Sequence, residues 1–181
     1  ELVRENNFYN LKYKDIYLHN RENPVLEAQS IFSGTTNEPV SICFIYGIGL
    51  GYLFQVASLN SKGTVILYEP DLDLLKTVFN LVDFSKDLSK PNVFLTNDFK
   101  KACSIIHSKS GMKNFPYMLS LPSQREMDSV GFDSLVKSLR DTIGSYFLDL
   151  KYTKEKFYPT LWMLLYNIPN LINETPLIKV K

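Results

Sequence analysis

Three glycines at alternate positions are the residues of this chain best suited to holding a ligand. Gly47, Gly49 and Gly51 directly follow the apolar run Ile42 to Tyr46. Glycines after a buried strand let backbone N–H groups approach a ligand without side-chain interference. The alternate spacing differs from the G-x-G-x-x-G of dinucleotide sites and points to a nucleoside site of the S-adenosylmethionine type. We include Tyr52, which follows the loop, among the predicted ligand-binding residues.

Acidic and amide side chains follow the next two apolar runs. Glu69 ends the run Thr64 to Tyr68, 18 residues after the last of the three glycines. A carboxylate there can accept hydrogen bonds from both ribose hydroxyls of a nucleoside. Asp71 is placed to cap the following helix, and Asn97 and Asp98 end a third strand, where they could contact an adenine edge. All four lie at carboxyl ends of strands, so we predict that they line one pocket with the glycine loop.

Two interpretations of the loop stay open at this point. Methyltransferases usually carry an acid two residues before the first glycine, whereas this chain has Ile45. The predicted fourth strand contains Pro116 and Tyr117 but not the Asn/Asp-Pro-Pro-Tyr pattern of amino-methylating enzymes. Alternatively, the glycines only make a tight strand-to-helix turn and Glu69 caps a helix. No nucleophile or general base is indicated, and neither histidine has metal-ligand spacing around it, so we expect no catalytic residue and no metal site.

The elements that must position these residues alternate between strand and helix. The sequence predicts strands over residues 14–20, 42–46, 64–68, 92–98 and 115–122. Apolar residues at helical spacing predict helices that start at Pro24, run over 50–59, follow Asp71 and pass through 102–106. This alternation is typical of a parallel sheet with right-handed crossovers. We therefore expect an α/β fold, a Rossmann-like doubly wound and mostly parallel sheet.

The pattern changes after Pro122. Ser123 and Glu126 could form a capping box, and apolar residues from Phe132 to Leu150 predict a long amphipathic helix. The segment from Phe157 to Ile168 has too much apolar surface to stay in water, so we expect it to pack on a neighbouring domain or on another copy.

Composition sets the domain organisation and the class of partner. The 181 residues divide into a predicted α/β core over 1–122 and a helical extension over 123–181. With 20 basic and 19 acidic residues, the chain has no overall field to attract nucleic acid or an anionic membrane. No apolar run approaches the roughly 20 residues of a membrane span, and no signal peptide is indicated. We expect a cytoplasmic protein with neither nucleic acid nor membrane as partner, and a piece of a longer chain.

Three stretches of the sequence, in this order, resemble one family. The chain contains "IYLHNRENPVLEAQSIF", "FIYGIGLGYLFQVASL" and "VILYEPDLDLLKTVFNLVDFS". They look like the N-terminal domain of the bacterial motility-associated-factor (Maf) proteins, which are flagellin glycosyltransferases. The tail "WMLLYNIPNLINETPLIKV" is similar to the lead-in to that family's central catalytic domain. The positions that match the family's motifs are His19, Asn23-Pro24, Glu27-Ala28, Gly47 to Tyr52 and Glu69 to Asp71.

The resemblance implies a part in flagellin glycosylation and motility. Proteins of this family transfer an activated nonulosonic acid, such as CMP-linked pseudaminic or legionaminic acid, to Ser or Thr of flagellin. Their central domain carries a Gly-Pro-Ser motif, which this chain lacks, so the chemistry is expected downstream of Lys181. The chain alone would then not be catalytic.

The implied partners are the downstream catalytic domain and flagellin as acceptor, and the apolar segment from Phe157 to Ile168 adds a second copy in a homo-oligomer as an expected partner. The glycine loop would keep a pocket for a nucleoside, either S-adenosylmethionine or a nucleotide-sugar. Two other functions stay open: an S-adenosylmethionine-dependent methyltransferase-like domain, and a non-catalytic protein-interaction module.

Overall fold

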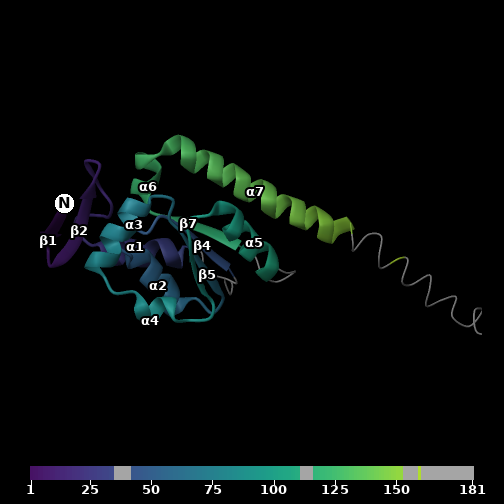
Figure 1. Ribbon diagram of the computed structural model, residues 1–181, viewed down its shortest axis with the longest axis horizontal. Helices are drawn as coiled ribbons and strands as arrows, with labels where there is room; N and C mark the ends of the chain where they lie inside the picture. Colours follow the sequence, from purple (N-terminus) through teal and green to yellow (C-terminus); the bar gives the residue numbers. More distant parts are fainter. Residues whose placement is uncertain (35–41, 111–115, 153–158, 160–181) are drawn as a thin grey trace, which may run out of the picture. The chain divides into compact units, whose positions relative to one another are not determined.

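A parallel sheet with helices on both faces forms the centre of the molecule (Figure 1). The computed structural model describes residues 1–34, 42–110, 116–152 and 159. Within them the parallel strands are β4 (Ile42–Tyr46), β5 (Thr64–Tyr68), β6 (Val93–Thr96) and β7 (Pro116–Ser120). The helices are α1 (Pro24–Ser33), α2 (Tyr52–Asn60), α3 (Leu72–Leu81), α4 (Ser85–Leu88), α5 (Phe99–Lys109), α6 (Pro122–Met127) and α7 (Ser129–Tyr152). The predicted α/β fold class, Rossmann-like with a C-terminal helix, is confirmed.

The order of the strands creates a switch point beside β4. The sheet runs β6-β5-β4-β7, with every described pair parallel. The chain moves outward from β4 through β5 to β6 and then returns to the other side of β4 to form β7. Open α/β sheets bind ligands at the carboxyl ends of the strands where the direction of winding reverses. The carboxyl ends of the neighbouring strands β4 and β7 are that place in this fold.

Each face of the sheet is buried under different helices. Because successive side chains of a strand point to opposite faces, Cys43 and Ile45 pack with residues of α1, α2 and α3, whereas Phe44 packs with α5. Leu135 and Leu139, from the first part of α7, complete the second cluster. Burial on both faces explains why β4 and β5 are continuous apolar runs.

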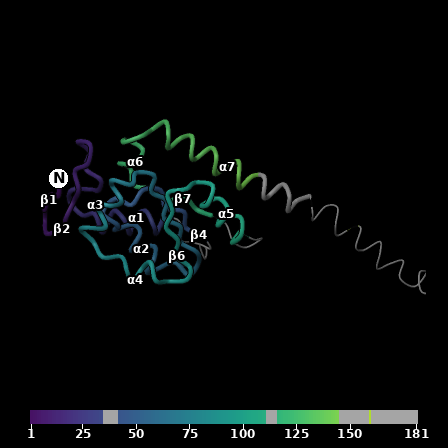
Figure 2. The backbone as a smooth tube through the Cα atoms, viewed as in Figure 1, coloured from purple at the N-terminus to yellow at the C-terminus, as the bar shows by residue number. Residues whose placement is uncertain are grey.

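An antiparallel sheet precedes the core and is mostly absent from the sequence-based prediction. It consists of β1 (Leu2–Glu5), β2 (Phe8–Tyr13) and β3 (Ile16–Tyr17), so the strand predicted over 14–20 is wrong in its extent. Its two turns use Asn6-Asn7 and Lys14-Asp15, all with positive φ. Paired positive φ values are typical of the tight turns that match hairpin twist. Figure 2 shows the chain passing from this sheet into the core.

After β7 the predicted long helix is present as α7, whereas the predicted capping box is absent. Ser123 does not cap a helix; its hydroxyl donates to the Leu18 carbonyl oxygen at 2.7 Å, and α6 begins at Pro122. The chain separates into the units Glu1–Leu139 and Arg140–Lys181. Apart from Pro159, the apolar segment predicted over 157–168 lies outside the described residues. Among the helices that the structure describes, none has the length and apolar character needed to cross a bilayer.

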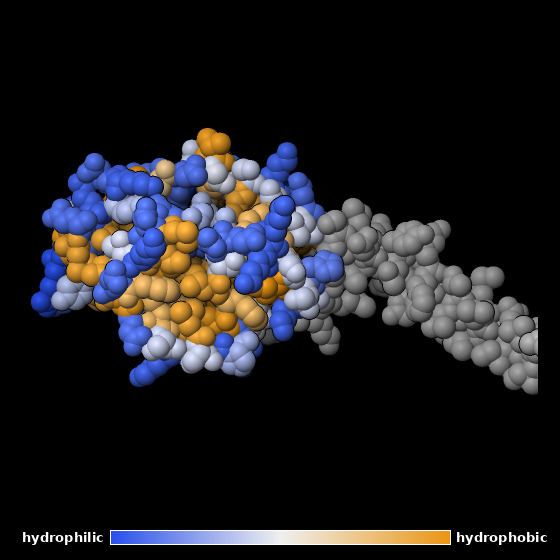
Figure 3. All heavy atoms as spheres, in the orientation of Figure 1, coloured by the Kyte–Doolittle hydropathy of each residue, from blue (hydrophilic) through white to orange (hydrophobic). Residues whose placement is uncertain are grey.

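Apolar side chains gather on the face of the molecule seen in Figure 3, bordered by polar ones. Several large apolar residues of the described chain are well exposed, among them Leu59 at 74% and Leu26 at 59%. Surfaces of this kind often mark contacts with other proteins. The predicted homo-oligomer nevertheless stays a prediction.

Candidate functional site

The glycine loop is covered by side chains of the chain itself. Gly47, Gly49 and Gly51 have φ values of +84°, +55° and +88°. A Cβ added to any of them would lie 2.1 to 2.5 Å from another side chain, closer than real Cβ atoms come. The glycines are therefore required by packing as well as by backbone conformation. The side chains that occupy the three positions are, in order, Gln124, His19 and Phe84.

Most backbone amides of the loop are already paired. Gly47 N donates to the Tyr68 carbonyl oxygen at 2.9 Å, and Gly51 N to that of Ile48 at 2.8 Å. Ile48 N donates to a carboxylate oxygen of Glu69 at 2.8 Å. Leu50 N donates to a ring nitrogen of His19 at 2.7 Å. Any ligand that used these amides would have to displace bonds made within the chain.

Glu69 joins the ends of two strands to the start of a helix. Its side chain is 1% exposed; one oxygen accepts from Ile48 N and the other from Asp71 N, each at 2.8 Å. Burial raises the pKa of the Glu69 carboxyl, and the two amide bonds oppose that shift. Both oxygens thus have partners inside the chain, while contact with a ribose stays a prediction.

Asp71 links the N-terminal sheet to α3. One oxygen accepts from Asp73 N and Leu74 N at 3.1 Å each, which is the predicted helix cap. The other accepts from the Tyr13 hydroxyl and from Lys14 Nζ, each at 3.0 Å. Burial works to raise the pKa of Asp71, but the bonds from Leu74 N, Lys14 and Tyr13 hold it below its usual value. The ionised carboxylate is therefore the stable form here.

His19 is the centre of a network that the sequence indicated only through the family resemblance. Its Nε2 accepts from Leu50 N, and its Nδ1 lies 3.5 Å from a carboxylate oxygen of Glu27. The Asn10 side chain bonds both the N–H and the carbonyl of His19, at 3.1 and 2.7 Å. The Tyr52 ring stands edge-on to it at 5.1 Å. These contacts fix the N-terminal sheet, α1 and the glycine loop to one another.

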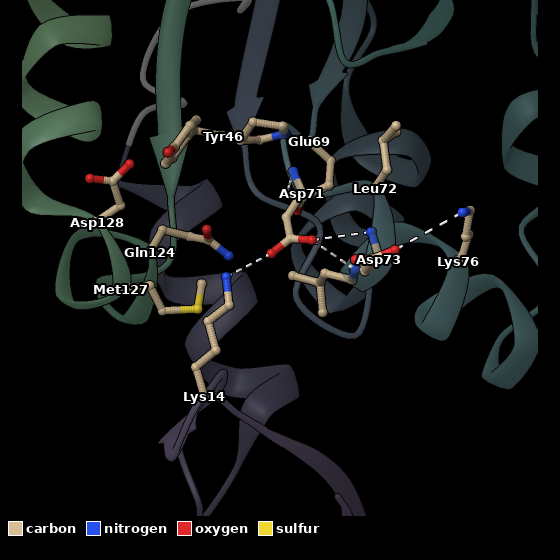
Figure 4. Close-up of a pocket in the computed structure, with 12 residues that line it drawn as sticks. Lys14, Tyr46, Glu69, Asp71, Leu72, Asp73, Lys76, Gln124, Met127 and Asp128 are labelled. Carbon is tan, nitrogen blue, oxygen red and sulfur yellow. Dashed lines mark hydrogen bonds and ion pairs between the residues drawn. The ribbon is translucent and has the colours of Figure 1, made fainter.

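Beside this network, at the carboxyl ends of β4 and β5, is a cleft of about 630 Å³ (Figure 4). Its walls come from the turn after β2, the end of β4, the start of α3 and α6. The cleft therefore lies beside the switch point of the sheet, where the fold favours a ligand. The side chains that matter for its chemistry are Lys14, Tyr46, Asp71, Lys76, Gln124 and Asp128.

Tyr46 and Gln124 are the two most buried polar side chains at the inner end of the cleft after Glu69. Burial raises the pKa of Tyr46 to about 12, with further contributions from the charges of Asp128 and Glu69, so its hydroxyl stays neutral. Gln124 is 4% exposed, and its Nε2 has no hydrogen-bond partner in the part of the chain described. No group of three or more His, Cys, Asp or Glu side chains in the same residues could hold a metal ion.

The structure brings together only some of the predicted site residues. Glu69 and Asp71 line the cleft, but Tyr52 donates its hydroxyl to the Tyr9 carbonyl oxygen at 3.0 Å and lines a separate hollow. Asp98 caps α5 by accepting from Lys100 N at 2.8 Å, and Asn97 is exposed beside it. Neither Asn97 nor Asp98 is part of the cleft wall.

Among the residues of the cleft that the sequence-based prediction missed, some follow β7, Lys14 lies on the N-terminal sheet, and Tyr46 and Lys76 lie on β4 and α3. Gln124 and Asp128 come just after the strand that returns to the far side of β4. Polar residues after a strand beside a switch point are the signal that could have found them. Lys14 lies in a turn of the N-terminal sheet, and no spacing in the sequence connects it to the core.

Comparisons with known proteins add little to this geometry. No family model matches the chain, and no curated protein matches it. Among solved structures, it is similar to a crystal structure of a proposed transferase from Pyrococcus horikoshii, with 15% identity and a TM-score of 0.33. The similarity covers 51% of this chain and 37% of that one. Similarity at this level shows no shared function.

Proposed function

We propose that this chain is the accessory N-terminal Rossmann-like domain of a Maf-type flagellin glycosyltransferase, and that its part in the reaction is to bind and position. One observation supports this role. The motif residues that carry the family resemblance, although spread over more than fifty positions, meet in one hydrogen-bonded network around the glycine loop. His19 Nε2, both oxygens of Glu69 and both oxygens of Asp71 accept hydrogen bonds from the chain itself.

A network of this kind stabilises a scaffold. A general base needs a lone pair that can reach the substrate. His19 and Glu69 are only 4% and 1% exposed, and each oxygen of Asp71 already accepts two hydrogen bonds from the chain. In the proposed reaction, the anomeric carbon of the sugar bonds to a Ser or Thr oxygen of flagellin, CMP leaves, and a base takes the hydroxyl proton. We assign that base to the expected downstream domain.

The direct test measures donor hydrolysis and sugar transfer with a CMP-linked nonulosonic acid and flagellin. The 181-residue chain should be inactive alone, and a longer protein that joins it to the proposed catalytic domain should be active. The longer protein with Glu69→Gln should lose activity in proportion to its loss of folded protein. Turnover by the 181-residue chain alone would contradict the proposal.

The methyltransferase alternative has its own test. Titration with S-adenosylmethionine should give no binding heat, because the amides of the glycine loop are occupied by Tyr68, Glu69, His19 and Ile48. Glu69→Ala is not a clean control, since it also removes the acceptor of the buried Ile48 amide and of the partly buried Asp71 amide. Micromolar binding, worth about 8 kcal/mol, would favour the methyltransferase instead.

A further inference from the structure

The inner end of the cleft holds a buried polar atom for which the described chain supplies no partner. Gln124 is 4% exposed and its Nε2 makes no hydrogen bond there. The amide lies against Gly47, where an added Cβ would stand 2.1 Å from Gln124 Cδ, so the loop leaves room for it. Buried polar groups without partners are rare in folded proteins and call for an explanation.

The amide is directed into the cleft. Figure 4 shows the Gln124 side chain reaching toward the centre, where Lys14 and the Asp71 carboxylate also point. Lys14 Nζ uses one of its three hydrogens on Asp71, which leaves others for a ligand. The neutral Tyr46 hydroxyl, which can donate and accept, adds a third group. The cleft therefore offers several hydrogen-bonding groups to one small molecule.

The charges around the cleft argue against an anion. The lining contains two ammonium groups, from Lys14 and Lys76. It contains four carboxyl side chains, and so more acidic than basic groups: Glu69, Asp71, Asp73 and Asp128. A phosphate would meet this negative surplus. A cation would meet the Lys14 ammonium and the amide hydrogens at the centre. A neutral ligand avoids both penalties.

Hydroxyl groups of a neutral ligand match the hydrogen-bonding groups that the cleft offers. A hydroxyl both donates and accepts, so it pairs with the Gln124 amide whichever way the amide is turned. Met127 and Leu72 supply apolar wall against which C–H groups can lie. The volume of about 630 Å³ falls within the usual range of small-molecule pockets, roughly 300 to 1,000 Å³.

We propose that this cleft binds an uncharged, polyhydroxylated molecule of monosaccharide size, with the Gln124 amide bonded to one of its hydroxyls. The site is separate from the amides of the glycine loop. This proposal does not depend on the glycosyltransferase role proposed above, because it is argued only from the residues of the cleft.

The test is an NMR titration of the ¹⁵N-labelled 181-residue protein. The probes are D-glucose, D-mannose, N-acetyl-D-glucosamine and myo-inositol, with inorganic phosphate and choline as charged comparisons. At least one neutral probe should shift the side-chain NH₂ signals of Gln124 in a saturable way. Gln124→Leu, which keeps side-chain volume over Gly47, should weaken that binding about tenfold or more, worth about 1.4 kcal/mol. The matched control Gln55→Leu, on α2 outside the cleft, should bind as the unaltered protein does.

Three outcomes would overturn the proposal. They are no shift of the Gln124 signals with any neutral probe, tighter binding of phosphate or choline than of every neutral probe, and unchanged binding by a folded Gln124→Leu. If Gln124→Leu does not fold, the Gln124 signals of the unaltered protein decide, through the first two of these outcomes. Because no transfer reaction is measured, failure here is distinct from failure of the proposed function.

Discussion

Glu69 shows how one buried carboxylate can hold three parts of the backbone in place. Its two oxygens accept from Ile48 N in the glycine loop and from Asp71 N at the start of α3, while Glu69 itself directly follows β5. Buried amides that lose their acceptors keep the full cost of leaving water. The stability of the loop should therefore depend on this side chain whether or not a ligand binds.

Glu69→Gln should lower the free energy of unfolding by about 1 to 3 kcal/mol, because an NH₂ group would replace one acceptor and face a backbone donor. Urea unfolding followed by circular dichroism measures this change. Asp73→Asn is the control, since the Asp73 side chain is 88% exposed and its loss should change stability by at most about 0.5 kcal/mol. Equal stability of Glu69→Gln and the unaltered protein would show that the two bonds contribute nothing.

The elements divide into those that local pattern determines and those that long-range contacts determine. β4 and β5 lie where continuous apolar runs predicted them, because strands buried on both faces need such runs. The N-terminal sheet was mostly missed, since β1 and β2 mix polar and apolar residues without a clear period. The contact of Gln124 with Gly47 joins positions far apart in the chain, and the spacing of apolar residues along the sequence does not predict such contacts.

The attachment of the N-terminal sheet to α3 should depend on pH through Asp71. The pKa of Asp71 is lower in the folded protein, so its stabilising contribution is complete above the unfolded pKa and is lost as pH falls through the folded one. Asp71→Asn can still cap α3 but carries no charge. Between about pH 5 and pH 3, the unaltered protein should therefore lose more stability than Asp71→Asn.

Urea unfolding at several pH values measures this difference. The control is Asp133→Asn, whose carboxylate is 63% exposed and pairs with Arg125 at 3.5 Å; its pH profile should follow that of the unaltered protein. If the stability of Asp71→Asn and that of the unaltered protein changed equally with pH, the Asp71 carboxylate would not be the cause of the pH dependence.

At the scale of the whole molecule, the second face of the sheet depends on residues beyond Pro122. Leu135 and Leu139, 9% and 4% exposed, pack in the cluster that contains Phe44 and Ile66. A chain ending at residue 122 would leave that part of the cluster uncovered. The unit Glu1–Leu139 contains both leucines.

Residues 1–139 alone should therefore unfold cooperatively, while residues 1–122 alone should bind a hydrophobic dye and aggregate. Each buried leucine contributes about 1.5 to 3 kcal/mol of apolar burial, enough to matter in a domain of this size. Thermal unfolding and size-exclusion chromatography compare the two chains. A cooperative transition in residues 1–122 would place the limit of the folding unit before α6.

The glycine loop has a consequence for the rate at which its amides exchange with solvent. Ile48 N and Leu50 N donate to Glu69 and His19 of the chain itself, so their hydrogens should exchange slowly in the free protein. A loop that orders only around a ligand would exchange fast until the ligand arrived. A ligand that enters the neighbouring cleft thus meets walls already in place, and its association should follow a single exponential whose rate rises linearly with ligand concentration.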